Sequence, residues 1–379
     1  MTTATAPLQR LARLEGYLSE DPGNTGLLAE VANAAIAGGA LDRASELLGS
    51  VADDPAPQFA HLRGLLQLAR HEFSDAALTF DALLHAQGDI AGVRFNLGYA
   101  LFRLGELHRA MAVFQALVAR ADAPPESLAY LMRCLHHAGT PALALDAWRA
   151  ASPALRTLSA VGVASLACLD SNQSDDALTL SEEALRAESP PLEALVTRAT
   201  LAVGQGNTSL AGALLEQARQ RAPDEGRIWS AMGAAWLLQG DVGAADQAFR
   251  RATELLPEHV GGWVSLSWCQ ILLKNLDGAR ASLEAALALD RNFSETHGGL
   301  GVIAALQGLR GEAEAAIERA LRLDRASLSA RYAEAVLNGQ AADVSAIQAL
   351  ARRLLRGRSG GDGVALLERV LGGLPGRTG

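Results

Sequence analysis

Apolar residues recur along the chain at helical spacing, and the helices that this pattern predicts come in pairs. Short turns containing Gly, Asn, Asp or Pro separate the members of a pair and one pair from the next. The clearest pairs occupy residues 94–118 and 228–257. The pattern therefore predicts a series of helix hairpins, in each of which a first helix (A) is followed by a second (B).

One alanine marks the same place in successive pairs and gives the repeat its length. The series is Ala76, Ala110, Ala144, Ala177, Ala211, Ala245, Ala279 and Ala313. Consecutive members are 34 residues apart, except for the 33 residues between Ala144 and Ala177. Such a regular spacing indicates that each pair is one unit of a repeat array, in which every unit packs on its neighbours.

Two further positions accompany this alanine. Twelve residues before it stands a mostly small residue: Gly64, Gly98, Met132, Ser165, Ala199, Gly233, Ser267 or Gly301. Four residues after it stands a mostly bulky one: Phe80, Phe114, Trp148, Ser181, Leu215, Phe249, Leu283 or Ile317. Small residues on both helices let A and B cross closely. The bulky residues are expected to fill the space between units, and Ser181 is expected to mark a weaker interface.

A helix pair every 34 residues is the period of tetratricopeptide repeats, and residues 57–325 resemble this family over eight units. One unit keeps nearly all of the family's Trp–Leu–Gly–Tyr–Ala–Phe–Ala–Pro pattern: Trp229, Met232, Gly233, Trp236, Ala245, Phe249, Ala252 and Pro257. The resemblance implies an all-α fold, namely a right-handed superhelical α-solenoid of about nine tetratricopeptide hairpins with capping helices.

The same period divides the chain into segments. We expect an N-terminal capping helix in residues 1–24, a degenerate repeat in 25–56 and eight repeats in 57–325. Capping helices are expected in residues 326–357, and a flexible tail with a short helix in 358–379. The glycines between 357 and 361 are expected to form a joint that lets the helix at 364–371 fold back over the groove.

Composition and charge argue against some classes of partner. The net charge is −9, whereas a nucleic-acid binder needs a basic face. Neither a secretory signal nor an apolar run long enough to span a membrane is visible, which favours a cytoplasmic location. Lys274 is the only lysine, and together with abundant Ala and Gly this bias indicates a GC-rich bacterial genome.

The sequence offers little catalytic or metal chemistry. Cys134, Cys168 and Cys269 are odd in number and widely spaced, so they indicate neither a disulfide framework nor a zinc ribbon. Cys134 with His136 and His137 suggests a metal site, but a closed zinc site needs four ligands, and structural thiols are the favoured interpretation. No phosphate-binding loop or dinucleotide fingerprint occurs. We therefore expect no enzyme activity, no cofactor and no metal.

In tetratricopeptide proteins the A helices line the concave face of the superhelix, and the resemblance places two patches there. The first is aromatic and cationic: Phe95, Tyr99, Phe102, Arg103, Arg133, His136 and His137. The second is apolar: Leu237, Val264, Trp268 and Ile271. Exposed apolar and aromatic side chains mark contact surfaces. The expected partner is a protein or peptide with apolar and acidic anchors.

These features predict a non-catalytic scaffold or adaptor that binds a peptide or helix of a partner in the concave groove. The carboxylate clamp of the family's chaperone-binding branch is not kept, because His61 and Leu65 replace its Lys and Asn. Two alternatives stay open, a secretion or envelope-assembly chaperone and the regulatory subunit of an enzyme on another chain. An incompletely capped solenoid can also stack end to end, so a homodimer is a further expectation.

Overall fold

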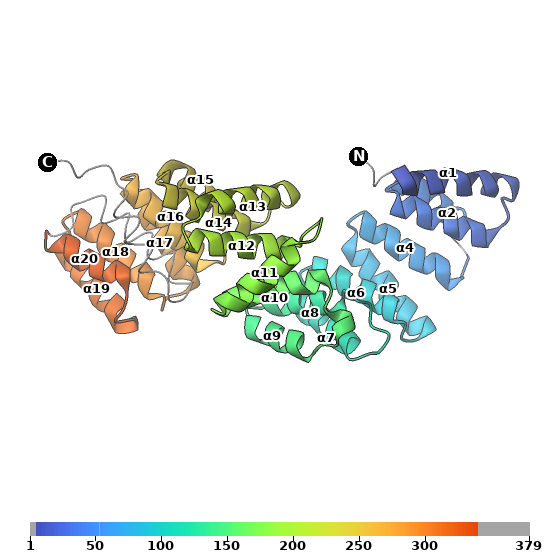
Figure 1. The fold of residues 1–379 in the computed structure, drawn as a ribbon, viewed down its shortest axis with the longest axis horizontal. Coiled ribbons are helices and arrows are strands. Elements are labelled where there is room, and N and C mark those ends of the chain that lie inside the picture. Colours follow the sequence, from blue (N-terminus) through green and yellow to red (C-terminus); the bar gives the residue numbers. More distant parts are fainter. Residues whose placement is uncertain (1–4, 53, 340–379) are drawn as a thin grey trace. The chain divides into compact units, whose positions relative to one another are not determined.

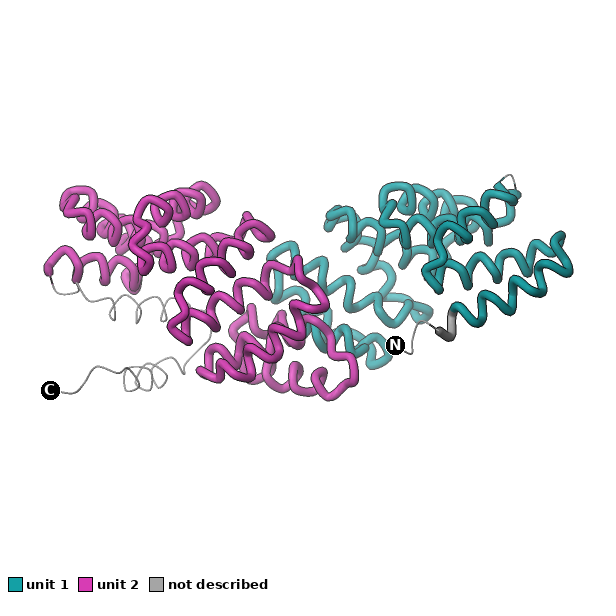
Figure 2. The backbone as a smooth tube through the Cα atoms, turned by 90° about the horizontal axis from the view of Figure 1, so that it is seen from above, with its two compact units in different colours: residues 1–164 teal, residues 165–379 magenta. Residues whose placement is uncertain are grey.

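The computed structural model describes residues 5–52 and 54–339, and every regular element in these ranges is a helix (Figure 1). The chain divides into two compact units, residues 1–164 and 165–379 (Figure 2). In each unit, consecutive helices pack as antiparallel hairpins. The predicted all-α solenoid of stacked hairpins is confirmed.

The first unit contains the helices up to α9, one short 3-10 helix (η1) and the start of α10. Their bounds are α1 Thr5–Glu20, α2 Thr25–Ala37, α3 Leu41–Gly49, α4 Pro57–Ala69, α5 Phe73–Gln87, α6 Ala91–Arg103, α7 Leu107–Val118, α8 Ser127–His137, α9 Pro141–Ala150 and η1 Pro153–Leu155. Helix α1 packs Leu11, Leu14 and Leu18 against the apolar side chains of α2.

The second unit begins within α10 and is described as far as Gly339. Its helices are α10 Leu158–Asp170, α11 Ser174–Leu185, α12 Leu192–Gly204, α13 Thr208–Arg221, α14 Gly226–Gln239, α15 Val242–Leu255, α16 Val260–Leu272, α17 Leu276–Leu289, α18 Ser294–Leu306, α19 Arg310–Leu323 and α20 Leu328–Leu337. The helices predicted at 343–356 and 364–371, and the joint between them, lie outside the described residues.

The close crossing of A and B helices rests on the alanine series. Every one of its eight members is fully buried. The opposite glycines are needed as well, because a Cβ added at Gly64, Gly98 or Gly233 would lie 2.6, 2.8 or 2.9 Å from an aromatic ring of the B helix. Ordinary van der Waals contact starts at about 3.5 Å. A backbone without a side chain is therefore the surface on which these rings rest.

The bulky residues do more than fill the space between units. Phe80, Phe114 and Phe249 are the rings that lie on the glycine of their own hairpin, because a residue four after the alanine stands one turn further on the same face of helix B. Phe114 also stacks on Tyr130 of the next hairpin, with ring centroids 5.5 Å apart. At Ser181 no ring is available, and its buried hydroxyl donates to the carbonyl of Leu178.

A second repeated contact fixes the turn that leads into each of the last four A helices that the structure describes. A side-chain nitrogen near the start of the helix donates to the carbonyl six residues earlier, at 2.7 to 3.0 Å. The donors stand 34 residues apart in the sequence: Trp229, Trp263, His297 and Arg331. A carbonyl only accepts, so His297 carries a proton on Nε2.

The last described helix, α20, is held tightly against α18. The carboxylate of Glu295 accepts hydrogen bonds from the backbone N–H groups of Leu328 and Ser329, both at 3.0 Å, and from the Ser329 hydroxyl. These N–H groups belong to the first turn of α20, where a negative charge is stabilising. Gly298 permits the approach, because a Cβ there would stand 2.6 Å from the backbone nitrogen of Ala330.

None of the described helices is both long enough and apolar enough to span a bilayer.

Substituting Gly298 with Ala should destabilise the second unit by about 1–3 kcal/mol, because the new methyl group meets rigid backbone rather than a movable side chain. The matched control is Gly212→Ala in α13, where a Cβ would have nothing within 4 Å. The control should be stabilising by about 0.5–1 kcal/mol, since Gly is unfavourable inside a helix. Urea unfolding followed by circular dichroism compares the two, and equal midpoints would contradict the close α18–α20 contact.

Candidate functional site: an aromatic surface on the A helices

Helix α6 carries three aromatic residues on one face, at spacings of four and three residues. Phe95, Tyr99 and Phe102 are each half-buried, and each presents its ring edge-on to Tyr130 of α8. The centroid distances are 5.6, 5.4 and 5.6 Å, within the range that aromatic pairs prefer. Tyr130 is therefore the centre of a cluster that joins two neighbouring A helices.

Two guanidinium groups lie against these rings. Arg103 is 4.4 Å from the ring centroid of Phe73, at the start of α5, and donates to the Tyr99 hydroxyl at 2.9 Å. Arg133 lies 5.0 Å from the Tyr130 ring and donates to the Ser159 hydroxyl at 2.9 Å. Both are cation–π contacts, which also fix the plane of the guanidinium. We call Phe95, Tyr99, Phe102, Tyr130, Arg103 and Arg133 the aromatic surface.

Burial affects the titration of groups at and beside this surface. Burial is the main cause that raises the pKa of Tyr130, so its hydroxyl stays protonated at neutral pH. In α4, His61 lies 3.2 Å from the amide nitrogen of Asn96, which donates to Nε2 of the neutral imidazole. Desolvation lowers the pKa of His61 below its ordinary value of 6.5.

The two neighbouring histidines of the first predicted patch differ in exposure. His137 is exposed and presents its ring edge to Phe102 at 5.7 Å. His136 is only 8% exposed, so the expectation that it lies on the open surface is wrong. Consecutive residues on a helix point about 100° apart, which places one ring outside and the next one inside.

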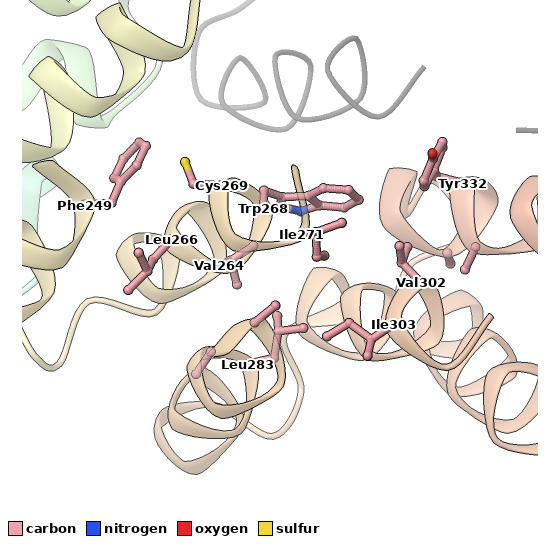
Figure 3. Close-up of a cluster of buried hydrophobic side chains, with 14 of the residues drawn as sticks. Phe249, Val264, Leu266, Trp268, Cys269, Ile271, Leu283, Val302, Ile303 and Tyr332 are labelled. Carbon is pink, nitrogen blue, oxygen red and sulfur yellow. The ribbon is translucent and has the colours of Figure 1, made fainter. Parts of the chain in front are cut away.

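The second predicted patch is not an exposed surface. Leu237, Val264, Trp268 and Ile271 are 2%, 6%, 1% and 3% exposed. They belong to one apolar cluster with Val302, Ile303 and Tyr332 (Figure 3). The indole of Trp268 in α16 meets edge-on the ring of Tyr332 in α20, two A helices further along the chain, at a centroid distance of 6.0 Å.

Direct packing of the A helices is the reason for this difference. In the second unit α16 contacts α18, and α18 contacts α20 along its length. Gly298 and Gly301 let α20 approach α18 closely, and Gly299 lies against Leu283 of α17. Trp268 stands at the same repeat position as Tyr99, yet it is enclosed where Tyr99 stays partly open.

The predicted patches include neither Tyr130 nor Phe73, which lies on a B helix and contacts Arg103. The sequence does hold one indication of this cluster, because consecutive A helices each carry an aromatic residue at an interior position, Phe95 and Tyr130. To predict a contact between two repeats, one must know how far apart they lie, and the period alone does not give that distance.

The cysteines are enclosed in helix packing. All three are buried, and burial raises the pKa of both Cys134 and Cys269 to about 12. Throughout the part of the chain that the structure describes, no three His, Cys, Asp or Glu side chains gather in a way that could hold a metal ion.

Comparison with known families agrees with the helix pairs. One tetratricopeptide repeat model matches residues 61–127 and 196–260, and a second matches residues 260–293. Together with the hairpins and their 34-residue spacing, these matches show that the chain belongs to the tetratricopeptide repeat proteins. Such repeats generally form non-catalytic interaction scaffolds. No curated protein sequence matches this chain.

Solved structures share the fold at low sequence identity. One is the crystal structure of the APC/C hetero-tetramer Cut9-Hcn1, with 14% identity and a TM-score of 0.61; the match covers 83% of this chain and 63% of that one, less than two thirds of its length. Another is the human IFIT1 dimer with PPP-AAAA, with 16% identity, a TM-score of 0.53 and coverage of 95% and 94%. At such identities the likeness concerns the fold alone.

We expect all three thiols to be unreactive in the folded protein. A thiol with a pKa of about 12 is almost entirely protonated at pH 8, and the thiolate is the reactive form. Titration with a chromogenic disulfide should show no fast-reacting cysteine in buffer and three in denaturant. A rapid stoichiometric reaction of the folded protein would contradict the buried placement.

Acid should destabilise the first unit through His61. Its pKa in the folded state lies below the ordinary value of 6.5, so the unfolded chain takes up the proton first as the pH falls. The stabilisation is complete above pH 6.5 and is lost as the pH drops toward the folded-state pKa. His61→Gln keeps an acceptor for Asn96 but does not titrate. Thermal melts between pH 7.5 and 5 should show a smaller loss for this variant than for the wild type; parallel curves would exclude His61 as the cause.

Proposed function

We propose that this protein is a non-catalytic scaffold that binds a peptide or helix of a partner protein on the aromatic surface of its first unit. The observation that supports this most is the contrast between equivalent positions. Tyr99 and Phe102 keep part of their rings accessible, whereas Trp268 and Ile271 at the same repeat positions are enclosed. Burial in the core explains the apolar residues at the enclosed positions. It does not explain the partly accessible rings, and contact with a partner does.

The chemistry of the surface indicates what a partner contributes. Aromatic and Arg residues are enriched among the side chains that dominate binding energy at protein interfaces. Apolar side chains of the partner would pack on the open parts of Phe95, Phe102 and Tyr130, whose ring edges are already fixed by one another. Such a surface loses little conformational entropy when it binds, because its rings are held before the partner arrives.

The test removes two rings of the aromatic surface and retains Tyr130 at its centre. The double variant Phe95→Ala with Phe102→Ala should recover at least tenfold less partner than the wild type in affinity capture from the source cells, read by quantitative mass spectrometry. Leu78→Ala is the matched control, since this leucine is 68% exposed on α5 and lies outside the surface. Circular dichroism must show that both variants are folded. Undiminished capture by a folded double variant would exclude this surface as the binding site.

A further inference from the structure

The three A helices that build or flank the aromatic surface differ in charge from the chain as a whole. The chain as a whole has 42 Asp and Glu against 33 Lys and Arg. Helices α4, α6 and α8 contain neither Asp nor Glu. Their only charged or histidine side chains are basic ones: His61, Arg63, Arg94, Arg103, Arg133, His136 and His137. An acidic protein thus keeps carboxylates off the helices that form this surface.

Two of these arginines have structural tasks elsewhere. Arg63 donates to the carbonyl oxygens of Val51 and Ala52, beyond the end of α3. Arg94 pairs with Asp89 at 2.5 Å in the turn before α6. A partner could not bind either arginine without breaking these contacts. The arginines that lie against the rings are the remaining candidates.

Arg103 has a different environment. It is exposed, and its partners among the described residues are the ring of Phe73, the ring of Tyr99 and the Tyr99 hydroxyl. All of these are neutral groups. The guanidinium is held by the cation–π contact with Phe73 and by a hydrogen bond from Nη1 to Tyr99, which leaves its remaining N–H groups for another acceptor. A planar fork held in this way matches a carboxylate.

Positive groups outnumber carboxylates around the centre of the cluster. Two positive groups, Arg133 and Arg103, and one carboxylate, Glu126, act on the Tyr130 hydroxyl. Exposed carboxylates, Glu72 and Asp75, stand in the sequence beside the ring that Arg103 contacts, but neither is paired with Arg103.

We propose that Arg103 receives a carboxylate of the partner, so that the segment bound by the aromatic surface is acidic, with an Asp or Glu close in sequence to the apolar residue that packs on Phe95 and Phe102. This inference rests on the proposed function and specifies its partner. Recognition requires both elements, because the rings supply apolar contact and Arg103 supplies a directional, charged hydrogen bond.

The experiment uses the full chain and a random peptide library displayed on phage. Peptides selected on the wild type should be enriched in Asp or Glu beside an apolar residue. A synthetic copy of the strongest peptide, measured by fluorescence anisotropy, should bind Arg103→Glu at least tenfold more weakly and Arg310→Glu equally well. Arg310 is the control because it is an exposed arginine of the second unit. Replacing the peptide's acidic residue with Lys should restore binding to Arg103→Glu.

Two outcomes would overturn the inference, and they differ. Enriched peptides without acidic residues, bound equally by Arg103→Glu but lost in the Phe95→Ala, Phe102→Ala variant, would refute the carboxylate contact and leave the aromatic surface as a binding site. Selection of no peptide, or of peptides that the double variant still binds, would refute the proposed function as well.

Discussion

The close approach of two helix backbones is the constraint on which this structure depends. A buried alanine on each B helix lets the A helix come near, and in three hairpins a glycine of the A helix carries an aromatic ring directly on its backbone. Interiors are packed so densely that one added methylene is felt there. Each hairpin therefore has a fixed thickness, and fixed thickness is what allows one hairpin to stack on the next.

Within that scaffold, the side chains at the A-helix positions decide whether a face stays accessible. In the first unit, Phe95, Tyr99 and Phe102 of α6 meet around Tyr130 of α8 and stay half-buried. In the second unit Gly298 and Gly301 let α20 approach α18 closely, and the side chains at the corresponding positions of α16 are enclosed. One architecture thus provides a partly open aromatic face in one place and a closed apolar core in another.

The sequence predicted the repeat well and the surface only in part. Positions set within one hairpin, such as the alanine series, follow from periodicity because helix geometry determines them. Trp268 was expected to be open and is enclosed, because it is covered by α20, two A helices further along, and Gly298 permits the close approach of α20 to α18. His136 was misplaced for a smaller reason, the rotation between adjacent residues. Accessibility is a property of several units together, and a repeat position does not specify it.

The hydrogen bond at the start of each of the last four described A helices is made by different types of side chain. An indole, an imidazole and a guanidinium perform the same task at positions 229, 263, 297 and 331. The family models stop matching at residue 293, just before the indole gives way to the other two donors. These four turns share a side-chain nitrogen that reaches the carbonyl six residues earlier, and they do not share one residue type. The same turn can therefore be built in repeats whose residues differ at this position.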